Sequence, residues 1–404
     1  MNRKILLFYL TVFFASGLIF ANPVPKTIQV GGLNRDYLIY TPQNPSQENP
    51  NGIIVCLHGF GRTMQDFFEV YDVSSVADSL NLIMLAPQAL EEQNVLVKLL
   101  AGTIGYLTND QISLNSVWGC GLSVRVNPFN INEELNRDVD DVDFINTIID
   151  NVLLEYSMPS ENLFVLGTSM GGFMAYQFAL TKGEQLSGLI SIAGSMGLSI
   201  KGMDYSTKVP ICDFHSVTDE VVPYSGTMTQ ALGTVSLSMS KQDVIDYWTD
   251  TNLTGTPVIE TVDYYPSTNG ITAEKITYPD QDNEVIHYKM NGSSHSYFFK
   301  KENGDCMDYA EEIMKFINSH STDDFNIIPN ILAQKAFFYP NPVQDNIYFG
   351  IMNGNVSIYD IAGREVFSRS FSSGQTDLSS LKSGIYIIKI QSENSVQVNR
   401  LIKK

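Results

Sequence analysis

Short apolar segments alternate with segments of helical periodicity between residue 27 and about residue 320. Short apolar runs are typical of strands buried on both faces, whereas apolar positions three and four residues apart indicate amphipathic helices. We expect strands at 28–30, 37–40, 52–57, 82–85, 163–166, 189–192, 209–214 and 285–290. The first two, joined through Gly31 and Gly32, form an antiparallel pair. The alternation as a whole predicts an α/β fold, with a mostly parallel sheet and helices on both faces.

The segments between these strands carry the helical pattern. We expect helices at about 64–81, 137–156, 173–180 and 306–319. Within 137–156 the apolar side chains on one face are Val139, Val142, Ile145, Ile149, Val152 and Leu153. Asp138, Asp140 and Asp141 precede or begin this helix, where negative charge suits the positive end of the helix dipole.

The pattern changes after His320, and a chain of 404 residues exceeds the usual size of one domain. Residues 321–334 contain turn formers without sustained periodicity, which is typical of a linker. Beyond them, 335–404 is rich in β-formers interrupted by glycines. The strand-like runs there lie at 347–351, 356–360 and 385–390. We therefore predict a large α/β domain over 22–320 and a small all-β sandwich over 335–404.

The N-terminal residues have the pattern of a signal peptide. Arg3 and Lys4 precede an almost wholly apolar run, Ile5 to Phe20, that ends at Ala21. This run of about 16 residues is shorter than the roughly 20 that a spanning helix needs. We expect residues 1–21 to be removed on export.

Composition limits the classes of partner. The chain has 25 Lys+Arg and 44 Asp+Glu, a formal charge of -19, which would repel nucleic-acid phosphates and anionic membrane surfaces. The four cysteines Cys56, Cys120, Cys212 and Cys306 show no metal-ligand spacing, so neither a metal site nor a cofactor is indicated. Export would permit disulfides, and the sequence leaves their pairing open.

The candidate nucleophile is Ser169. It lies at the centre of Gly167-Thr168-Ser169-Met170-Gly171, between an expected strand and an expected helix. This is the context that a nucleophile elbow requires, because the tight turn exposes the hydroxyl at the end of the strand. Ser195, within 193–197, lacks the leading glycine and the following helix, so we interpret it as a loop serine.

A serine hydroxyl needs a base, and the base needs a carboxylate that fixes its tautomer. In the α/β-hydrolase fold, the carboxylate and the histidine both follow the serine along the chain, and the carboxylate comes first. Asp219 comes just after an apolar strand and is our candidate acid. Asp213 lies within that strand and is the main competitor, and Glu220 ranks third.

The sequence offers five histidines as candidate bases. His295 lies in a loop of small residues after the strand at 285–290 and before the last helix, where the base belongs. His287 is inside that strand and is interpreted as structural. His58 and His215 end earlier strands, and His320 lies at the domain edge, so His295 is our candidate.

Ester cleavage places negative charge on the carbonyl oxygen, which calls for two N–H donors. The glycine-rich turn Leu57-His58-Gly59-Phe60-Gly61 follows a strand. We predict the main-chain N–H groups of Phe60 and Met170 as these donors. Gly61 could replace Phe60.

The region up to residue 320 resembles the secreted esterases related to polyhydroxybutyrate depolymerases and feruloyl or acetylxylan esterases. The segments that carry the resemblance are 57–60, Ala86-Pro87-Gln88, Ser116-Val117-Trp118-Gly119, 139–144, 167–172, Asp219 with Val222-Pro223-Tyr224, Tyr247-Trp248 with Asn252, and 292–295. No family motif matches between Gln88 and Ser116. The resemblance implies that Trp118 lines the acyl pocket, with a buried core tryptophan as the alternative.

Residues 335–404 resemble the sorting domain of type IX secretion cargo. The matching segments are Tyr339-Pro340-Asn341-Pro342-Val343, Asp345, Ile358 to Arg364, Leu378, Leu381, Gly384-Ile385-Tyr386 and Lys403-Lys404. The resemblance implies export through the periplasm and across an outer membrane, by the type IX machinery, to the medium or the cell surface. A carbohydrate-binding module is the structural rival.

Together these patterns favour a secreted serine carboxylic-ester hydrolase that forms an acyl-enzyme, with plant-polysaccharide esters (feruloyl or acetyl) as the expected substrates. The same triad would serve a polyhydroxyalkanoate depolymerase or a serine peptidase. From another class, a surface binding protein could use an inactive hydrolase scaffold.

Overall fold

The structure of the protein is a computed structural model. It describes residues 23–42, 49–71, 73–99, 114–126, 131–158, 160–200, 206–230, 233–236, 238–262, 264, 267, 270–295, 306–322, 338–339, 342–349, 353–360, 363–372, 374–391 and 396–404. The predicted signal peptide and most of the predicted linker lie outside the described residues.

A ten-stranded sheet forms the framework, in the order β1-β2-β4-β3-β7-β8-β9-β14-β13-β12. Its strands are β1 (Val24–Val30), β2 (Leu33–Tyr40), β3 (Gly52–Leu57), β4 (Leu82–Pro87), β7 (Leu163–Thr168), β8 (Gly188–Ile192), β9 (Ile211–Ser216), β12 (Val258–Val262), β13 (Thr272–Tyr278) and β14 (Val285–Asn291). The central strands β4, β3, β7, β8, β9 and β14 run parallel, and antiparallel strands flank them on both sides. The predicted mostly parallel sheet is therefore confirmed.

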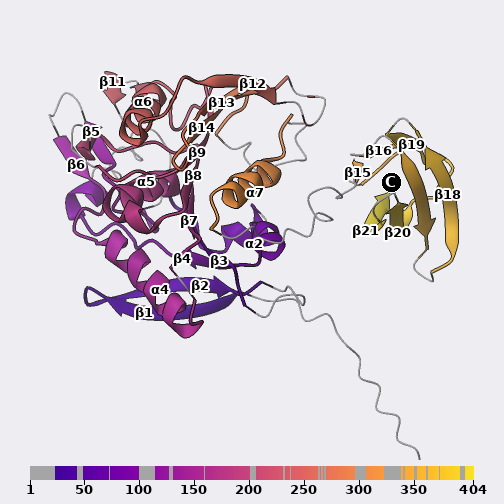
Figure 1. The fold of residues 1–404 in the computed structure, drawn as a ribbon, viewed down its shortest axis with the longest axis horizontal. Coiled ribbons are helices and arrows are strands. Elements are labelled where there is room, and N and C mark those ends of the chain that lie inside the picture. Colours follow the sequence, from indigo (N-terminus) through magenta and orange to yellow (C-terminus); the bar gives the residue numbers. More distant parts are fainter. Residues whose placement is uncertain are drawn as a thin grey trace, which may run out of the picture.

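Helices cover both faces of this sheet (Figure 1). The helices are α1 (Asp66–Glu69), α2 (Ser74–Leu80), α4 (Asp141–Glu155), α5 (Met170–Lys182), α6 (Lys241–Asn252) and α7 (Tyr309–Ser319), with short 3-10 turns at Gly183–Gln185 and Leu198–Ile200. Buried side chains of α4, α5 and α6 form one core with the sheet, and those of α1, α2 and α7 form a second core on the other face. Strand β3 alternates between the two cores, since Ile53 and Val55 belong to the first and Ile54 and Cys56 to the second.

The strand order reverses beside β3. The chain passes from β3 to β4 on one side and later returns to β7 on the other side of β3. In open α/β sheets, ligands bind beyond the carboxyl ends of strands at such a switch point. The loops after Leu57 and after Thr168 therefore meet at the position where this fold places a site.

The element boundaries correct several predictions. The single helix predicted at 64–81 was wrong, because the chain forms two short helices, α1 and α2, with irregular backbone between them. The helix predicted from residue 137 begins at Asp141, since the Asp140 carboxylate accepts a hydrogen bond from the Asp143 N–H at 2.9 Å and so caps the helix.

Several elements were not predicted. Helix α6, the strands β12 and β13, and two hairpins, β5 (Ser123–Val126) with β6 (Ile131–Glu134) and β10 (Thr227–Gln230) with β11 (Gly233–Ser236), gave no clear signal. In β12 the residues from Val258 to Thr261 are exposed, so the strand lacks the apolar alternation on which the sequence prediction relied.

The C-terminal region folds around a core of its own. A three-stranded sheet contains β15 (Phe338–Tyr339), β16 (Asn346–Phe349) and β19 (Gln375–Asp377), and a four-stranded sheet contains β18 (Glu365–Phe371), β17 (Gly354–Tyr359), β20 (Gly384–Gln391) and β21 (Val396–Lys403). The buried core residues between them, from Val343 to Leu401, all belong to this region. The expected small all-β unit is therefore confirmed.

All four cysteines are buried free thiols, which answers the pairing question that the sequence left open. Cys120 and Cys306 do not form a disulfide. Among the helices of the described residues, none combines the length and the apolar character needed to cross a membrane.

Candidate active site

The backbone at Ser169 forms a sharp turn between β7 and α5. Ser169 has φ 54° and ψ −120°, a conformation that non-glycine residues rarely adopt. Its N–H donates to the Ile192 carbonyl oxygen at 2.8 Å, which anchors the turn to the neighbouring strand β8. The strained turn places the hydroxyl beyond the carboxyl end of β7, as a nucleophile elbow requires.

The glycines around Ser169 are required by close backbone packing. A Cβ atom on Gly171 would lie 1.9 Å from the Leu57 carbonyl oxygen, and one on Gly167 would lie 2.1 Å from the Gly171 carbonyl oxygen. Both contacts are backbone contacts that no side chain could relieve. The elbow is therefore pressed against the end of β3.

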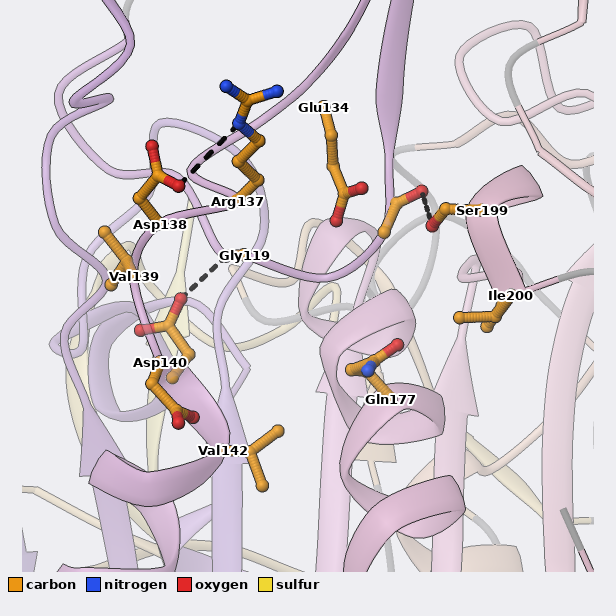
Figure 2. Close-up of a pocket in the computed structure, with 12 residues that line it drawn as sticks. Gly119, Glu134, Arg137, Asp138, Val139, Asp140, Val142, Gln177, Ser199 and Ile200 are labelled. Atoms are coloured by element: carbon orange, nitrogen blue, oxygen red, sulfur yellow. Dashed lines mark hydrogen bonds and ion pairs between the residues drawn. The ribbon is translucent and has the colours of Figure 1, made fainter. Parts of the chain in front are cut away.

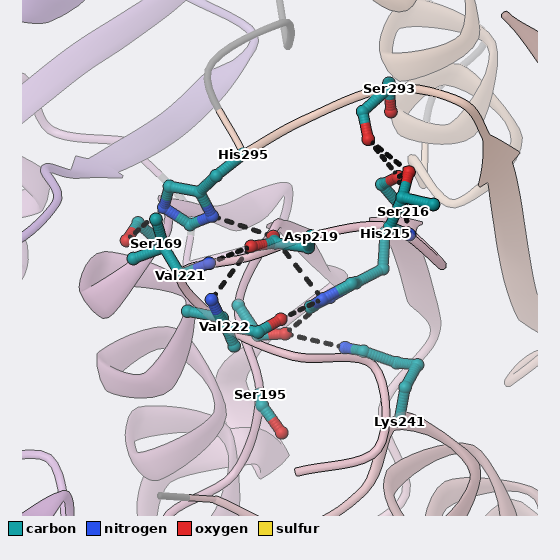
Figure 3. A network of polar contacts seen from close by, with 12 residues as sticks. Ser169, Ser195, His215, Ser216, Asp219, Val221, Val222, Lys241, Ser293 and His295 are labelled. Atoms are coloured by element: carbon teal, nitrogen blue, oxygen red, sulfur yellow. Dashed lines mark hydrogen bonds and ion pairs between the residues drawn. The ribbon is translucent and has the colours of Figure 1, made fainter. Parts of the chain in front are cut away.

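Three side chains that are distant in the sequence meet at the elbow (Figure 3). The Nε2 atom of His295 lies 2.9 Å from the Ser169 hydroxyl oxygen, and its Nδ1 atom lies 2.7 Å from Asp219 Oδ2. The serine, histidine and carboxylate thus form one continuous hydrogen-bonded chain. The structure brings together the three residues that the sequence singled out.

Asp219 is held firmly in the loop after β9. Its Oδ1 atom accepts hydrogen bonds from the N–H groups of Val221 and Val222, both at 2.8 Å, and the residue is only 5% exposed. Burial alone would raise the pKa of this carboxyl, but the hydrogen bond and charge of His295 outweigh it and hold the pKa below its usual range. The carboxylate is therefore ionised at neutral pH.

Asp213, the competing acid, lies in β9 and serves a different network. Its Oδ1 atom accepts from Lys241 Nζ at 2.7 Å and from the Tyr176 hydroxyl at 3.0 Å, and its Oδ2 atom lies 2.9 Å from His287 Nδ1. Burial would raise its pKa, but the Lys241 charge, together with the hydrogen bond and charge of His287, outweighs burial and holds the pKa well below the usual range. The third-ranked Glu220 is exposed.

The role of Lys241 as the partner of Asp213 was not predicted from the sequence. This lysine is 1% exposed, at the first position of α6. Lysines are almost never fully buried unless paired, and nothing in the surrounding sequence distinguishes Lys241 from a surface lysine. Only the fold shows that Asp213 lies opposite.

The loop after β3 approaches the serine. Gly59 packs so closely that a Cβ atom there would lie 3.3 Å from Ser169 Cβ. The Gly59 carbonyl oxygen accepts from the Arg62 N–H at 3.1 Å and lies 2.9 Å from His58 Nδ1. Because C=O and N–H point in opposite directions across a trans peptide, the Phe60 N–H points away from His58. The Gly61 N–H is engaged by the Ser116 carbonyl oxygen at 2.9 Å, which favours Phe60 over Gly61 as the oxyanion donor.

Trp118 supports this loop from inside the protein. The side chain is fully buried, at 0% exposure, and its indole N–H donates to the His58 carbonyl oxygen at 2.8 Å. Its ring lies 4.9 Å from the His58 ring, centroid to centroid. The structure thus places Trp118 in the core against the loop and does not bring it to the surface of a substrate pocket.

The His58 environment predicts how stability depends on pH. Burial lowers the pKa of His58 to about 4, whereas an unfolded histidine titrates near pH 6.5. Between those values the unfolded chain binds a proton that the folded chain does not. The contribution of neutral His58 to the free energy of unfolding is fully present above about pH 6.5. It falls by about 3 kcal/mol as the pH drops to about 4.

We therefore expect the melting temperature of His58→Asn to fall less than that of the wild type when the pH is lowered from 6.5 to 4. Asparagine retains a donor where His58 Nδ1 faces the Gly59 carbonyl oxygen but carries no titrating group. Thermal melts across this pH range measure the difference. Equal losses in the two proteins would contradict a neutral, buried His58.

The remaining candidates have structural partners. The Ser195 hydroxyl donates to the Met239 carbonyl oxygen at 2.9 Å and is buried. His287 Nε2 lies 2.9 Å from the Tyr224 hydroxyl. His320 follows α7 as its C-cap. None of the three contacts the Ser169–His295–Asp219 chain among the described residues.

A cavity of about 380 Å³ lies beside α5 and the start of α4 (Figure 2). Its lining includes Glu134, Asp138 and Asp140 together with Arg137 and Gln177. Figure 2 shows Glu134, Gln177 and Ser199 gathered at one side of it. Ser169, Asp219 and His295 are not among its lining residues, so this cavity is distinct from the hydrogen-bonded chain at the elbow.

Comparison with known families agrees with this geometry. Residues 127–246, which include the elbow and Asp219, match the Phospholipase/Carboxylesterase family model. The fold of this chain is that of the α/β-hydrolases. The candidate base His295 lies beyond the matched segment.

The individual proteins that this chain resembles are remote from it in sequence. It is 19% identical over 219 residues to the putative esterase NocK of Nocardia uniformis subsp. tsuyamanensis, and the match covers 54% of each chain, so it spans about half of that relative. The acetyl xylan esterase from Aspergillus awamori is 13% identical with a TM-score of 0.46, over 73% of this chain and 99% of that chain. S-formylglutathione hydrolase from Agrobacterium tumefaciens is 13% identical with a TM-score of 0.42, over 75% and 99%.

The C-terminal unit has a match of its own. Residues 337–404 match the model described as Secretion system C-terminal sorting domain. This match covers the two small sheets and begins close to the predicted boundary at residue 335. The match agrees with the resemblance to a sorting domain that the sequence shows in this region.

Proposed function

We propose that the protein is an exported serine carboxylic-ester hydrolase. The observation that carries the proposal is the continuous chain from the Ser169 hydroxyl through His295 to Asp219, with 2.9 and 2.7 Å between partners. A serine hydroxyl is a poor nucleophile until a base accepts its proton, and His295 Nε2 is in position to do so. The buried Asp219 carboxylate fixes the tautomer and stabilises the imidazolium that forms.

In the proposed reaction Ser169 Oγ attacks the ester carbonyl carbon while His295 accepts the hydroxyl proton. The main-chain N–H groups of Phe60 and Met170 stabilise the negative carbonyl oxygen. The attack gives a tetrahedral intermediate. When it collapses, the bond between the carbonyl carbon and the alcohol oxygen breaks, and the alcohol leaves with the proton from His295. Water, deprotonated by His295, then attacks the acyl-enzyme and releases the acid and Ser169.

We propose plant-polysaccharide esters, feruloyl or acetyl, as the substrates. The support is the resemblance to secreted feruloyl and acetylxylan esterases, carried by the segments around His58, Trp118, Asp219 and His295. A sorting domain for secretion is consistent with a polymeric substrate outside the cell, since a polysaccharide cannot enter the cell and the enzyme must be exported to reach it. A polyhydroxyalkanoate or a peptide bond is the alternative for the same triad.

Two measurements test the proposal in order. A fluorophosphonate probe should label the purified protein at Ser169, because the probe reports an activated serine nucleophile. A substrate panel of p-nitrophenyl acetate, methyl ferulate, acetylated xylan, a short polyhydroxybutyrate and a peptide then compares substrate classes. Absence of labelling would favour a binding protein on an inactive scaffold. Labelling with polyester or peptide preference would overturn only the substrate class.

The two separate cores predict how truncation behaves. A protein that ends near residue 320 should remain folded and active, because the core residues of the hydrolase and those of the C-terminal unit form separate clusters. In the native host it should accumulate inside the cell envelope, since it lacks the sorting domain. A thermal melt and fractionation check these expectations. Loss of the folded hydrolase on truncation would contradict the independence of the two units.

A further inference from the structure

A second histidine lies beside the candidate acid. His215, the last but one residue of β9, is fully buried, and its Nε2 atom lies 3.6 Å from Asp219 Oδ2. Figure 3 shows Asp219 between His295 on one side and His215 on the other. The proposed reaction uses His295 as the partner of Asp219 and assigns no role to His215.

The two ring nitrogens of His215 connect two loops of the site. Nε2 lies 2.8 Å from the Val222 carbonyl oxygen, and Nδ1 lies 3.0 Å from the Gly194 carbonyl oxygen. Val222 belongs to the loop whose N–H groups hold Asp219 Oδ1. Gly194 packs against the elbow, since a Cβ atom there would lie 2.7 Å from the Gly172 Cα atom. One buried imidazole thus lies between the acid loop and the turn behind the nucleophile.

Both acceptors are carbonyl oxygens, but a neutral imidazole has only one N–H. The Gly194 carbonyl oxygen also accepts from Lys241 Nζ at 2.7 Å, so it has a donor without His215. A proton on Nε2 would serve Val222 and would also face the Asp219 carboxylate. The charges near the ring are Lys241, Asp213 and Asp219, and the Tyr224 ring meets it edge-on. Burial and the Lys241 charge lower the pKa of His215 to about 4, which agrees with one proton at neutral pH.

We propose that His215 is a positioning residue for the reaction: it carries its proton on Nε2, donates it to the Val222 carbonyl oxygen, and so holds the 219–222 loop where Asp219 meets His295. The inference rests on the proposed function of the Ser169–His295–Asp219 chain. Its physical basis is that small displacements of catalytic groups are costly, with about 10²-fold lost for a shift of about 1 Å.

Two substitutions separate the two nitrogens. In His215→Gln the side-chain amide can reach the place of Nε2 and keep the donor to Val222, whereas in His215→Asn it reaches only the place of Nδ1. We expect kcat/KM of His215→Gln to stay close to the wild type. His215→Asn should lose about 10²-fold, chiefly in kcat, because Asp219 is no longer aligned with His295.

The pH profile distinguishes positioning from a general loss of packing. A displaced Asp219 stabilises the His295 imidazolium less, so the acid limb of kcat/KM should move to lower pH in His215→Asn and not in His215→Gln. His287→Gln is the matched control, since His287 is equally buried but contacts Asp213 and Tyr224 instead of the acid loop. It should lower the melting temperature and leave the acid limb in place.

Nitrogen NMR of the wild-type protein tests the proposal even if the variants fold poorly. The expected result is a neutral His215 ring protonated at Nε2. A ring protonated at Nδ1, or at both nitrogens at neutral pH, would overturn the proposal. So would an unimpaired His215→Asn, or equal losses in both variants with an unmoved acid limb. Failure of the wild type to react with a fluorophosphonate would instead refute the proposed function itself.

Discussion

Ser169→Ala is expected to remove nearly all esterase turnover while the protein stays folded. Among the described residues, the hydrogen-bond partner of the Ser169 hydroxyl is His295 Nε2, so loss of the hydroxyl leaves the packing of the elbow unchanged. Loss of a triad member costs several powers of ten, and the oxyanion site leaves a residual rate. Steady-state kinetics with p-nitrophenyl acetate, beside a thermal melt, measure both quantities.

Ser195→Ala provides the matched control for this variant. Ser195 also lies between glycines, but its hydroxyl is buried against the Met239 carbonyl oxygen. Loss of that hydrogen bond should reduce stability by about 1 kcal/mol and leave turnover per folded molecule unchanged. If Ser169→Ala retained activity within about tenfold of the wild type, the nucleophile would have to be sought elsewhere.

Asp219→Asn is expected to lower turnover by roughly 10⁴ with little effect on the fold. The change is nearly isosteric, and an amide oxygen can still accept from the N–H groups of Val221 and Val222. The amide that then faces His295 Nδ1 favours the wrong tautomer and removes the charge that stabilises the imidazolium. Turnover at saturating substrate is the relevant quantity, because both effects act on the chemical step.

Asp213→Asn should show the opposite pattern. Asp213 and Lys241 form a fully buried ion pair, and removal of one partner leaves an uncompensated charge that typically costs about 3–5 kcal/mol. Its turnover should therefore be compared per folded molecule, at a temperature below both melting transitions. A normal Asp219→Asn together with an inactive, folded Asp213→Asn would exchange the roles of the two carboxylates.

The sequence predicted the parts of the site that depend on local chain geometry. Ser169 was accessible to prediction because a strand, a glycine-flanked turn and a helix follow one another along the chain. Asp219 and His295 follow the strands β9 and β14, which are adjacent and parallel, so their loops meet at one edge of the sheet. Strand order and hydrophobic pattern were sufficient for that step.

The parts that depend on tertiary contacts could not be predicted. The sequence shows Trp118 as an aromatic residue beside a glycine. Only the fold reveals that its indole N–H donates a hydrogen bond to the His58 main-chain carbonyl oxygen. Lys241 has the sequence context of a surface lysine. Strand β12 lies at the sheet edge with exposed apolar residues such as Ile259, so its pattern resembles neither a buried strand nor an amphipathic one.

The four buried thiols give the protein native reporters of its own opening. Burial raises the pKa of Cys56 and Cys120, and the reactive thiolate form is therefore scarce in the folded state. Cys56 lies in β3 and Cys212 in β9, deep in the central sheet, whereas Cys306 lies just before α7. The rate at which a thiol reagent modifies each cysteine therefore measures how often that part of the hydrolase unfolds. Because these cysteines form no disulfide, their protection from oxidation depends on the folded state that buries them.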